Sequence, residues 1–478
     1  MKHPVSPEFE HVLQALREIK ADGQKLYLVG GAVRDLLLGK PVHDFDFVTA
    51  QGSRELAKAL RKKLAGASFA LDDERGFNRV ILDGGTPNER HIDIAEFVGD
   101  DLQADLRARD FTINAMALDI DNLGVLIDPL GGEADLKQGV LREASPDAFM
   151  NDPLRVMRAV RMAQAFNLGI SLKTLEHLRI AVKELRRVSG ERIRDEFFKI
   201  LDERDYEASL RQMWELGILS EIFPCLPCYS QDELFVSNQK VEKRLLRLKC
   251  LEQLYQDLES EQGLVCTSAS EKQRQAHIAG WQEQLNAYLD MQITPGRTVR
   301  NHLVLVALLL DLEPENALDS PIQLVANSFK FSKPESDFLS RIENALLSVT
   351  FSVSCDRHLI DMEVYRLLKE LKIASPAYAL LGLVLADTEL ENASKALNIC
   401  QENSLNLLSV WFQRGGEILK PNLLMDGNEI MHYAGLAPGP IIGDLLEKLE
   451  EAQFLGLIET IDQAKAFIDQ ELVQNNKR

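Results

Sequence analysis

Hydrophobic and polar positions follow two different patterns along this 478-residue chain. In roughly the first 140 residues, short apolar runs are separated by turn residues and by helical segments, which is typical of a small mixed sheet with helices. The segments that read as strands are 25–29, 43–48, 69–71, 79–82 and 91–97, and those that read as helices are 7–21 and 52–64. From about residue 205 onward the chain is rich in leucine and lacks strand signals. We therefore predict an α+β fold class, a small mixed-sheet head followed by all-α domains.

A cluster of turn residues from Asp128 to Gly132 ends the sheet region and gives way to helix. Its two glycines can form either a tight connection or a hinge. The predicted domains are a head over 1–140, a helical neck over 141–205, a helical body over 206–415 and a helical tail over 416–478. Residues 256–275 are the best candidate for an exposed connection.

Two aspartates lie on the strand-like segment 43–48, which reads His-Asp-Phe-Asp-Phe-Val. Alternate side chains of a strand share a face, so Asp44 and Asp46 project together and the phenylalanines point to the other side. Two like charges held this close repel each other unless a cation lies between them. Mg²⁺ is the usual hard cation for oxygen ligands. The pattern predicts that Asp44 and Asp46 bind Mg²⁺ and take part in catalysis.

A glycine pair, Gly30 and Gly31, ends the apolar segment before this strand and precedes a helical turn that carries Arg34. Glycines let backbone N–H groups approach a phosphate closely, and a helix that starts there offers its positive end. Arg34 adds a rigid fork of donors. A glycine pair alone is often a turn, and an Asp-x-Asp alone is often a solvated strand end. Together they predict a nucleoside triphosphate site.

Six motifs carry a resemblance to a known family: LVGGAVRDLLLG at 28–39, DFDFV at 44–48, RDFTINAMAL at 109–118, DPLGGEADL at 128–136, DPLRVMRAVR at 152–161 and GERIRDEFFKIL at 190–201. The chain resembles class II nucleotidyltransferases, which comprise bacterial CCA-adding tRNA nucleotidyltransferases, their CC-adding and A-adding relatives, and bacterial poly(A) polymerases. The resemblance implies template-independent addition of C and A residues from CTP and ATP to a tRNA 3′ end, by two-metal catalysis with Mg²⁺. CC-only, A-only and poly(A) addition stay open as alternatives, and the choice depends on the loop around residues 72–90.

Two further segments contain candidate residues. Asp93 lies on the alternating segment 91–97, where it is either an edge-strand charge or, as the resemblance implies, the third active-site carboxylate, which is usually a glutamate in the family. The segment 105–118 interleaves apolar residues at helical spacing with Arg109, Asp110, Thr112 and Asn114. These polar groups either contact a ribose hydroxyl and the triphosphate, as the resemblance implies, or form a network that pins this helix to the sheet. Ala108 stands where the family often has a second arginine.

An amphipathic helix is predicted over 152–166. Asp152 and Arg155 are three residues apart and share a face, where they suit the Watson–Crick edge of cytosine or adenine. Spacing alone favours a surface salt bridge between them, worth less than about 1 kcal/mol. The resemblance implies base selection, although Asn151 replaces the glutamate that leads the family's motif. The resemblance also implies that the helix is supported by Glu191, Arg192 and Glu196.

The net charge of −20 at first argues against a nucleic acid partner, but binding depends on where basic residues cluster. Arg155, Arg158 and Arg161 recur every three residues and indicate a nucleotide-binding phosphate track, with a solvated helix face as the alternative. The turn Pro438-Gly439-Pro440 either grips an RNA phosphate or is a plain helix start.

No apolar run reaches the roughly 18 residues that cross a membrane, and the first residues lack the apolar run of a signal peptide, so we expect a cytoplasmic protein with no membrane partner. The six scattered cysteines suit reduced thiols. No obligate protein partner is inferred. The segment 300–315 resembles the metal-binding segment of HD phosphohydrolases, but Leu310-Asp311 replaces its His-Asp pair. His302 and Asp311 therefore make no metal cluster, and a degenerate HD-like helical domain is expected over about 230–400.

Overall fold

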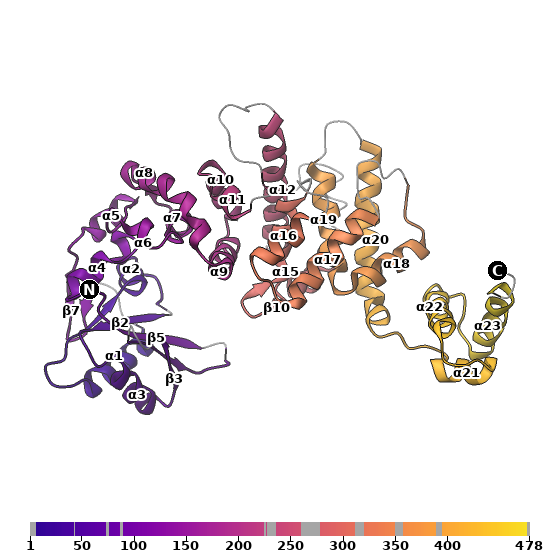
Figure 1. The fold of residues 1–478 in the computed structure, drawn as a ribbon, viewed down its shortest axis with the longest axis horizontal. Helices are drawn as coiled ribbons and strands as arrows, with labels where there is room; N and C mark the ends of the chain where they lie inside the picture. The colour runs from indigo at the N-terminus through magenta and orange to yellow at the C-terminus, as the bar shows by residue number, and fades with distance from the viewer. Residues whose placement is uncertain are drawn as a thin grey trace. The chain divides into compact units, whose positions relative to one another are not determined.

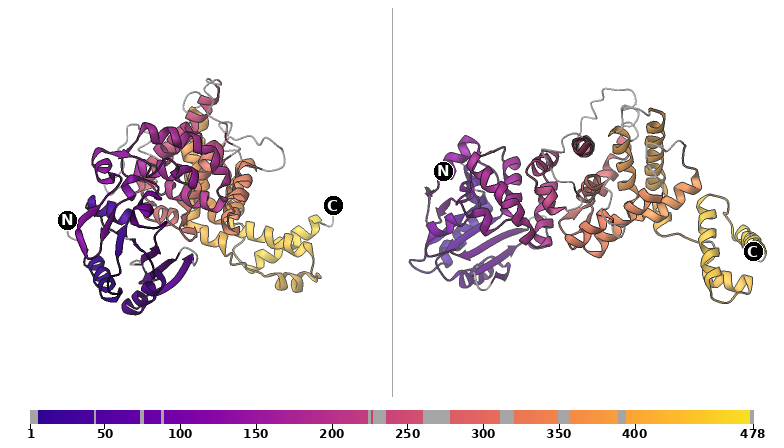
Figure 2. Two further views of the ribbon diagram at one scale, coloured as in Figure 1. Left: turned by 60° about the vertical axis from the view of Figure 1, so that its left-hand side comes forward. Right: turned by 45° about the horizontal axis from the view of Figure 1, so that its top comes forward.

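The computed structural model describes residues 6–42, 44–72, 76–86, 89–223, 226, 236–259, 278–310, 320–348, 357–388 and 394–475. The chain forms two compact units, one of Met1–Glu203 with Ala208–Pro224 and the other of Arg204–Glu207 with Cys225–Arg478. The large sheet lies in the indigo part of the chain (Figure 1), and helices make up nearly all of the orange and yellow part (Figure 2). The predicted α+β class is confirmed. The division into four domains stays a prediction.

The head contains one seven-stranded sheet in the order β3-β4-β5-β2-β1-β6-β7. Its elements are α1 (Pro7–Ile19), β1 (Leu26–Val29), α2 (Gly31–Leu37), β2 (Phe45–Thr49), α3 (Ser53–Leu64), β3 (Ala67–Asp72), β4 (Phe77–Leu82), β5 (Arg90–Glu96), α4 (Leu102–Arg107), the 3-10 helix η1 (Thr112–Asn114), β6 (Ala117–Asp119) and β7 (Asn122–Ile127). β2 and β5 pair in parallel, and the other neighbouring strands in this sheet are antiparallel.

The apolar side chains of β2 pack beneath the sheet against α1 and α3. Phe45 and Phe47 are each only 1% exposed, and the ring of Phe9 in α1 stacks on Phe45 with 4.8 Å between centroids. They belong to one apolar core with Leu56 and Leu60 of α3. The predicted alternation of this strand is confirmed, because its phenylalanines form the core and its aspartates lie on the other face.

One row of directly paired positions crosses the whole sheet and sets the position of the site. The row consists of Phe69 (β3), Arg79 (β4), Asp93 (β5), Asp46 (β2), Val29 (β1), Ala117 (β6) and Ile127 (β7). Paired residues of neighbouring strands share a face and lie about 5 Å apart. Val29 and Ala117 are covered by a second apolar cluster that includes Leu106 of α4. The charged residues of the row therefore lie beside this apolar cluster.

Short helices and two short strands follow the head sheet along the chain. The elements are α5 (Gly132–Gln138), β8 (Val140–Leu141), α6 (Ala148–Asn151), α7 (Arg155–Ala165), β9 (Gly169–Ile170), α8 (Leu172–Ala181), the 3-10 helix η2 (Val182–Arg187), α9 (Gly190–Leu201), α10 (Tyr206–Glu215) and α11 (Ile218–Ile222). The helix predicted over 152–166 begins later, at Arg155, because Asp152 is extended, with φ −144° and ψ 97°. The helix predicted over 105–118 is wrong, because Phe111 is also extended and bridges Glu143.

Among its described residues, the second unit is built of helices and one small hairpin. Its elements are α12 (Val236–Glu259), α14 (Gln282–Leu289), β10 (Gln292–Thr294), β11 (Arg297–Thr298), α15 (Val299–Leu309), α16 (Pro321–Ser328), α17 (Lys333–Ser348), α18 (Asp361–Leu371), the 3-10 helix η3 (Lys372–Ala374), α19 (Ser375–Thr388), α20 (Ser394–Leu419), α21 (Gly427–Ala434), α22 (Pro440–Phe454) and α23 (Ile461–Asn475). The hairpin of β10 and β11 contradicts the prediction of no strand after residue 205. Most of the predicted connection over 256–275 lies outside the described residues. Within the described ranges, no helix is both long and apolar enough to cross a membrane.

His302, singled out from the sequence, lies in a buried ion cluster of the second unit. Asp311 lies outside the described residues. The side chain of His302 is 0% exposed, with Nδ1 2.7 Å from the carbonyl oxygen of Thr298 and Nε2 3.3 Å from Oε1 of Glu335. Arg297 donates to both oxygens of Glu335, at 2.6 and 3.2 Å. Glu335 therefore compensates the charge of Arg297 inside the unit.

Replacing Glu335 by alanine should lower the free energy of unfolding by about 3–5 kcal/mol, because Arg297 loses the buried carboxylate that compensates its charge. Urea unfolding of the full chain at pH 7 measures this change. Glu417 provides the matched control, because its ion pair with Arg414 is about half exposed. Glu417→Ala should change the free energy by at most about 1 kcal/mol, and equal effects of the two substitutions would contradict the prediction.

The effect of Glu335→Ala should also depend on pH. Burial opposes ionisation of Glu335, but hydrogen bonds from His302, Arg297 and Ser332 outweigh it and hold the pKa of Glu335 well below its ordinary value of 4.5. A carboxyl whose pKa falls on folding stabilises the protein above its unfolded pKa and loses that contribution as the pH falls. The stability difference between wild type and variant should therefore shrink below pH 4.5.

Candidate functional site

Two carboxylates lie next to each other on the head sheet, on the face opposite the phenylalanine core. Asp46 of β2 and Asp93 of β5 are direct partners in the parallel pair, and Asp44 precedes β2 with its side chain 77% exposed. Burial, and after it the negative charge of Asp93, raise the pKa of Asp46 from 3.8 to about 6. Asp44 adds to this effect, whereas Arg109 opposes it. The site is therefore short of positive charge.

Asp93 has its own cation, Arg79 of β4, which the sequence analysis missed. Nε of Arg79 donates to Oδ1 of Asp93 at 2.7 Å, and Nη2 donates to Oδ2 at 2.8 Å. The interpretation of Asp93 as an edge-strand charge is wrong, because β5 lies between β4 and β2. Arg79 could not be found from the sequence, because its pairing depends on the register of two strands. Direct participation of Asp93 in catalysis stays a prediction.

The donor set of this face fits a divalent cation that nucleotide phosphates help to hold. The described part of the chain has no group of three His, Cys, Asp or Glu side chains that could hold a metal ion. Mg²⁺ commonly takes only one or two carboxylates and completes its six oxygen ligands with substrate phosphates and water. Asp44 and Asp46 can supply two such carboxylates. A cation beside Asp46 would offset the burial and the repulsion from Asp93 that raise its pKa.

The glycine turn lies directly beside these carboxylates. Gly30 follows β1 directly with φ +73° and ψ −141°, a conformation that side chains rarely adopt, and α2 starts at Gly31. A Cβ atom on Gly30 would lie 2.9 Å from Nη1 of Arg109 and 3.4 Å from Oδ2 of Asp46. The backbone of Gly30, the guanidinium of Arg109 and the carboxylate of Asp46 therefore converge on one place. Arg109 is held there by Asp105, at 3.0 and 3.2 Å.

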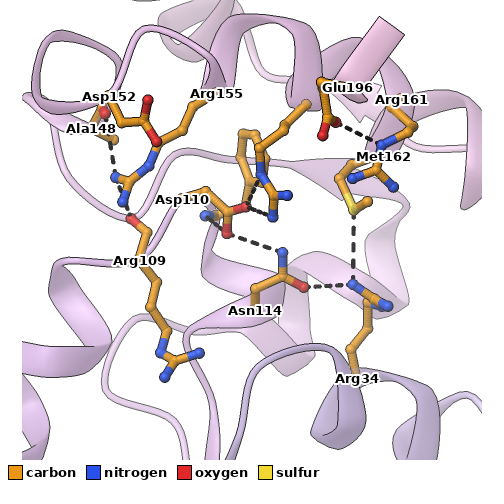
Figure 3. A network of polar contacts seen from close by, with 12 residues as sticks. Arg34, Arg109, Asp110, Asn114, Ala148, Asp152, Arg155, Arg161, Met162 and Glu196 are labelled. Atoms are coloured by element: carbon orange, nitrogen blue, oxygen red, sulfur yellow. Dashed lines mark hydrogen bonds and ion pairs between the residues drawn. The ribbon is translucent and has the colours of Figure 1, made fainter. Parts of the chain in front are cut away.

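Arg34 lies in a buried network with Asn114 and Met162 (Figure 3). Its Nη1 donates to Oδ1 of Asn114 at 2.6 Å and lies 3.8 Å from Sδ of Met162 in α7. Nε and Nη2 donate to Asp35 at 3.0 and 3.1 Å. The predicted phosphate contact of Arg34 stays a prediction, and the guanidinium is already engaged by four acceptors.

Asp110 is the centre of the same network (Figure 3). Its Oδ1 accepts hydrogen bonds from the backbone of Phe111 and from Asn114, and its Oδ2 accepts two from Arg158, the shorter at 2.6 Å. Burial opposes ionisation of Asp110, but Arg158 and these hydrogen bonds outweigh it and lower its pKa. Of the two interpretations from the sequence, the contacts support the internal polar network, although the segment is not one helix.

The predicted base-selecting pair lies at the start of α7, but its members do not pair with each other. Arg155 donates to the backbone oxygens of Ala108, Arg109 and Ala148 at 2.7, 3.1 and 3.3 Å (Figure 3). Asp152 instead accepts a hydrogen bond from Arg192 of α9 at 2.9 Å.

The other arginines of α7 are paired as well. Arg161 donates to Glu196 at 2.7 Å, so the predicted support of α7 by Glu196 is confirmed. Arg158 is held by Asp110. The phosphate track predicted from Arg155, Arg158 and Arg161 stays a prediction, and in this structure Arg158 and Arg161 are each part of an internal ion pair.

The chain matches two family models, the poly A polymerase head domain over residues 26–142 and the probable RNA and SrmB-binding site of polymerase A over residues 167–229. A CC-adding tRNA nucleotidyltransferase of Geobacter sulfurreducens is 31% identical over 454 residues, which cover 92% of this chain and 91% of the relative. An A-adding tRNA nucleotidyltransferase of Deinococcus radiodurans is 28% identical over 92% of this chain and 94% of the relative. The structure of a CCA-adding enzyme with ATP superposes with a TM-score of 0.66 at 25% identity, covering 98% of this chain and 96% of the other.

A mixed-sheet head with adjacent carboxylates and a glycine turn, followed by helical domains, defines a nucleotidyltransferase. The chain belongs to the tRNA nucleotidyltransferase family. The resemblance seen in the sequence and the enzyme class that it implied are confirmed. Members of this family use divalent metals, generally Mg²⁺. The relatives include CC-adding, A-adding and CCA-adding enzymes.

A Cβ atom on Gly30 should disrupt the site. Gly30→Ala strains the backbone and pushes Arg109 and Asp46 away from each other, so we expect kcat/KM for nucleotide transfer to fall about 100-fold. Incorporation of labelled nucleotide into tRNA measures this change. Gly23 is the matched control, because its φ of +77° is similar but no atom lies within 4 Å of its added Cβ. A loss of the same size in Gly23→Ala would show that backbone strain alone lowers activity.

Proposed function

We propose that this chain adds C and A residues from CTP and ATP to tRNA 3′ ends, without a nucleic acid template, to complete CCA. The observation that carries the proposal is the convergence of Asp46, Gly30 and Arg109 on one sheet face. This arrangement combines groups that suit a divalent cation with groups that suit a triphosphate. Similarity to tRNA nucleotidyltransferases over 92% of the chain supports tRNA as the acceptor.

Base selection is assigned to Asp152 and Arg155. The contacts of Asp152 with Arg192 and Leu154 leave lone pairs that can accept from an exocyclic amine. Arg155 uses three hydrogen bonds of its five N–H donors, which leaves two for a ring nitrogen or carbonyl of a base. Cytosine at C4 and adenine at C6 present an amine on the Watson–Crick edge, whereas uracil and guanine present a carbonyl at these positions. One pair can therefore accept both CTP and ATP.

Phosphate binding is assigned to the backbone N–H groups at the glycine turn and to Arg109. In the transfer, the 3′-hydroxyl of the RNA gives its proton to water and its oxygen forms a bond to the α-phosphorus, while the bond from this phosphorus to the oxygen that bridges it to the β-phosphorus breaks, releasing pyrophosphate. Asp44 and Asp46, with Asp93 assisting, would hold Mg²⁺, which stabilises the negative charge on the attacking and leaving oxygens when bound. Asp110, Asn114 and Arg158 keep the segment that carries Arg109 in place. We also propose that Asp110, Asn114 and Arg158 contact the nucleotide directly, as the family resemblance implies.

CC-only addition is a second candidate. It is favoured by the Geobacter sulfurreducens relative, a CC-adding enzyme that matches 92% of this chain at 31% identity. The two candidates differ in the final step, because a CC-adding enzyme stops before the terminal A. Three tRNA acceptors that end before CCA, after C and after CC separate them when each is incubated with labelled CTP or ATP and Mg²⁺. Growth to CCA supports the proposal, and arrest at CC supports the second candidate.

A generic RNA oligomer in the same assay tests for poly(A) polymerase activity, because long adenylate tails on it would overturn tRNA 3′-end completion. Asp46→Asn should lower incorporation on each tRNA by at least about 100-fold, since it removes a charge that the cation requires. Asp22→Asn is the control, because Asp22 lies exposed in the turn before β1. Incorporation by Asp46→Asn at the wild-type rate would contradict the role of this carboxylate.

Replacing Asp152 by asparagine should weaken the choice against UTP. An amide can donate to the carbonyl of uracil, so we expect the ratio of kcat/KM for CTP to that for UTP to fall about tenfold or more. Because Asp152→Asn also weakens the contact with Arg192, Arg192→Gln serves as the control and should leave the ratio near that of the wild type. An unchanged ratio in Asp152→Asn would contradict its role in base selection.

A further inference from the structure

Phe166 is the C-cap residue directly after α7 and lies against two cations of the head. The guanidinium carbon of Arg34 is 4.0 Å from the centroid of its ring, and Nζ of Lys40 is 4.6 Å from the same centroid. Such cation–π contacts are strengthened when the cation is withdrawn from water, and Arg34 is only 8% exposed. Nothing in the sequence marked Phe166, because its partners precede it by more than 120 residues.

Arg34 has little capacity left for a ligand. An arginine carries five N–H donors, and hydrogen bonds to Asp35, Asn114 and Met162 use four of them. Its guanidinium also lies beneath Gly31, where a Cβ would be 3.3 Å from Nη2. The ring of Phe166 contacts the face of the planar guanidinium group that a second partner could use. These contacts fix α2, the helix that starts at the glycine turn.

Phe166 is the last of four residues on one face of α7 that touch the head. At spacings of three, four and four, Arg155 binds the backbone of 108 and 109, Arg158 binds Asp110, and Met162 and Phe166 contact Arg34. Residues at these spacings lie along one side of a helix. The helix that begins with the base-selecting pair is therefore joined at its other end to the helix of the glycine turn.

We propose that Phe166 is a positioning residue for nucleotidyl transfer: by holding Arg34, its ring fixes the glycine-turn helix α2 to the nucleobase helix α7. The base bound at the start of α7 and the triphosphate bound at the glycine turn are parts of one nucleotide, so the distance between their sites must be fixed. Phe166 maintains that distance without touching the nucleotide. This inference rests on the proposed function of the site.

The test compares two substitutions of the same ring. Phe166→Leu keeps an apolar side chain but removes the π face, whereas Phe166→Tyr retains it. With tRNA acceptor and CTP, Phe166→Leu should lower kcat about tenfold, the size expected for one partly buried cation–π contact, and should change the KM for CTP less than about twofold. The groups that bind base and phosphate remain, but their mutual placement is lost. Phe166→Tyr should restore kcat to near the wild-type value.

Phe197 is the matched control for stability. Its buried ring packs on Phe223 and Phe198, with 5.1 and 6.4 Å between centroids, in the same unit of the chain. Phe197→Leu should lower the Tm but leave kcat near that of the wild type. The proposal is overturned if Phe166→Leu keeps the wild-type kcat, or if both leucine variants lose kcat to the same extent.

Hydrogen exchange separates this inference from the proposed function, because it needs no activity. Backbone amides of α2 should exchange faster in Phe166→Leu than in the wild type, and at the wild-type rate in Phe166→Tyr. If the wild type extends no acceptor, the proposed function fails, and faster exchange of α2 still supports the tie between the helices. If the backbone amides of α2 exchange at the wild-type rate in Phe166→Leu, the proposal that Phe166 fixes α2 to α7 is overturned, whatever the activity of the variant.

Discussion

The parallel pairing of β2 with β5 is the constraint on which the site depends, because it places two carboxylates at directly opposed positions of one sheet face. The fold neutralises them unequally. Asp93 accepts hydrogen bonds from Nε and Nη2 of Arg79 in a bidentate pair. The pKa of Asp46, in contrast, is raised to about 6 by burial and by the neighbouring charge. The unneutralised carboxylate lies beside the glycine turn, where a triphosphate and its cation would supply the missing partners.

Positive charge in this protein serves the internal framework as much as it serves a ligand. With a net charge of −20, the chain cannot attract RNA by its overall field. The arginines of α7 that the sequence indicated as a phosphate track are committed to Asp110, to Glu196 and to backbone oxygens. Their role in the structure is to hold α7 against the head and α9. Arg109 lies beside Asp46 at the glycine turn and remains the best candidate for phosphate.

The sequence was sufficient to predict those features of the site that depend on residues close together in the chain. The alternation of Asp44, Phe45 and Asp46 and the glycine turn before it are short-range patterns, and the structure has both. The partners of Arg34 could not be predicted, because Asn114 and Met162 lie 80 and 128 residues away. The segment 105–118 has helical spacing, yet tertiary pairing of Phe111 with Glu143 extends the chain and breaks the helix.

The central claim is that Asp46 and its neighbours hold a divalent cation together with the triphosphate. Its most direct test is electron paramagnetic resonance of Mn²⁺ bound to the full chain with a CTP analogue that cannot transfer its nucleotidyl group. The account predicts that the wild type binds Mn²⁺ more tightly with the analogue than without it, and that Asp46→Asn loses this gain. Equal Mn²⁺ binding by the wild type and Asp46→Asn in the presence of the analogue would contradict it.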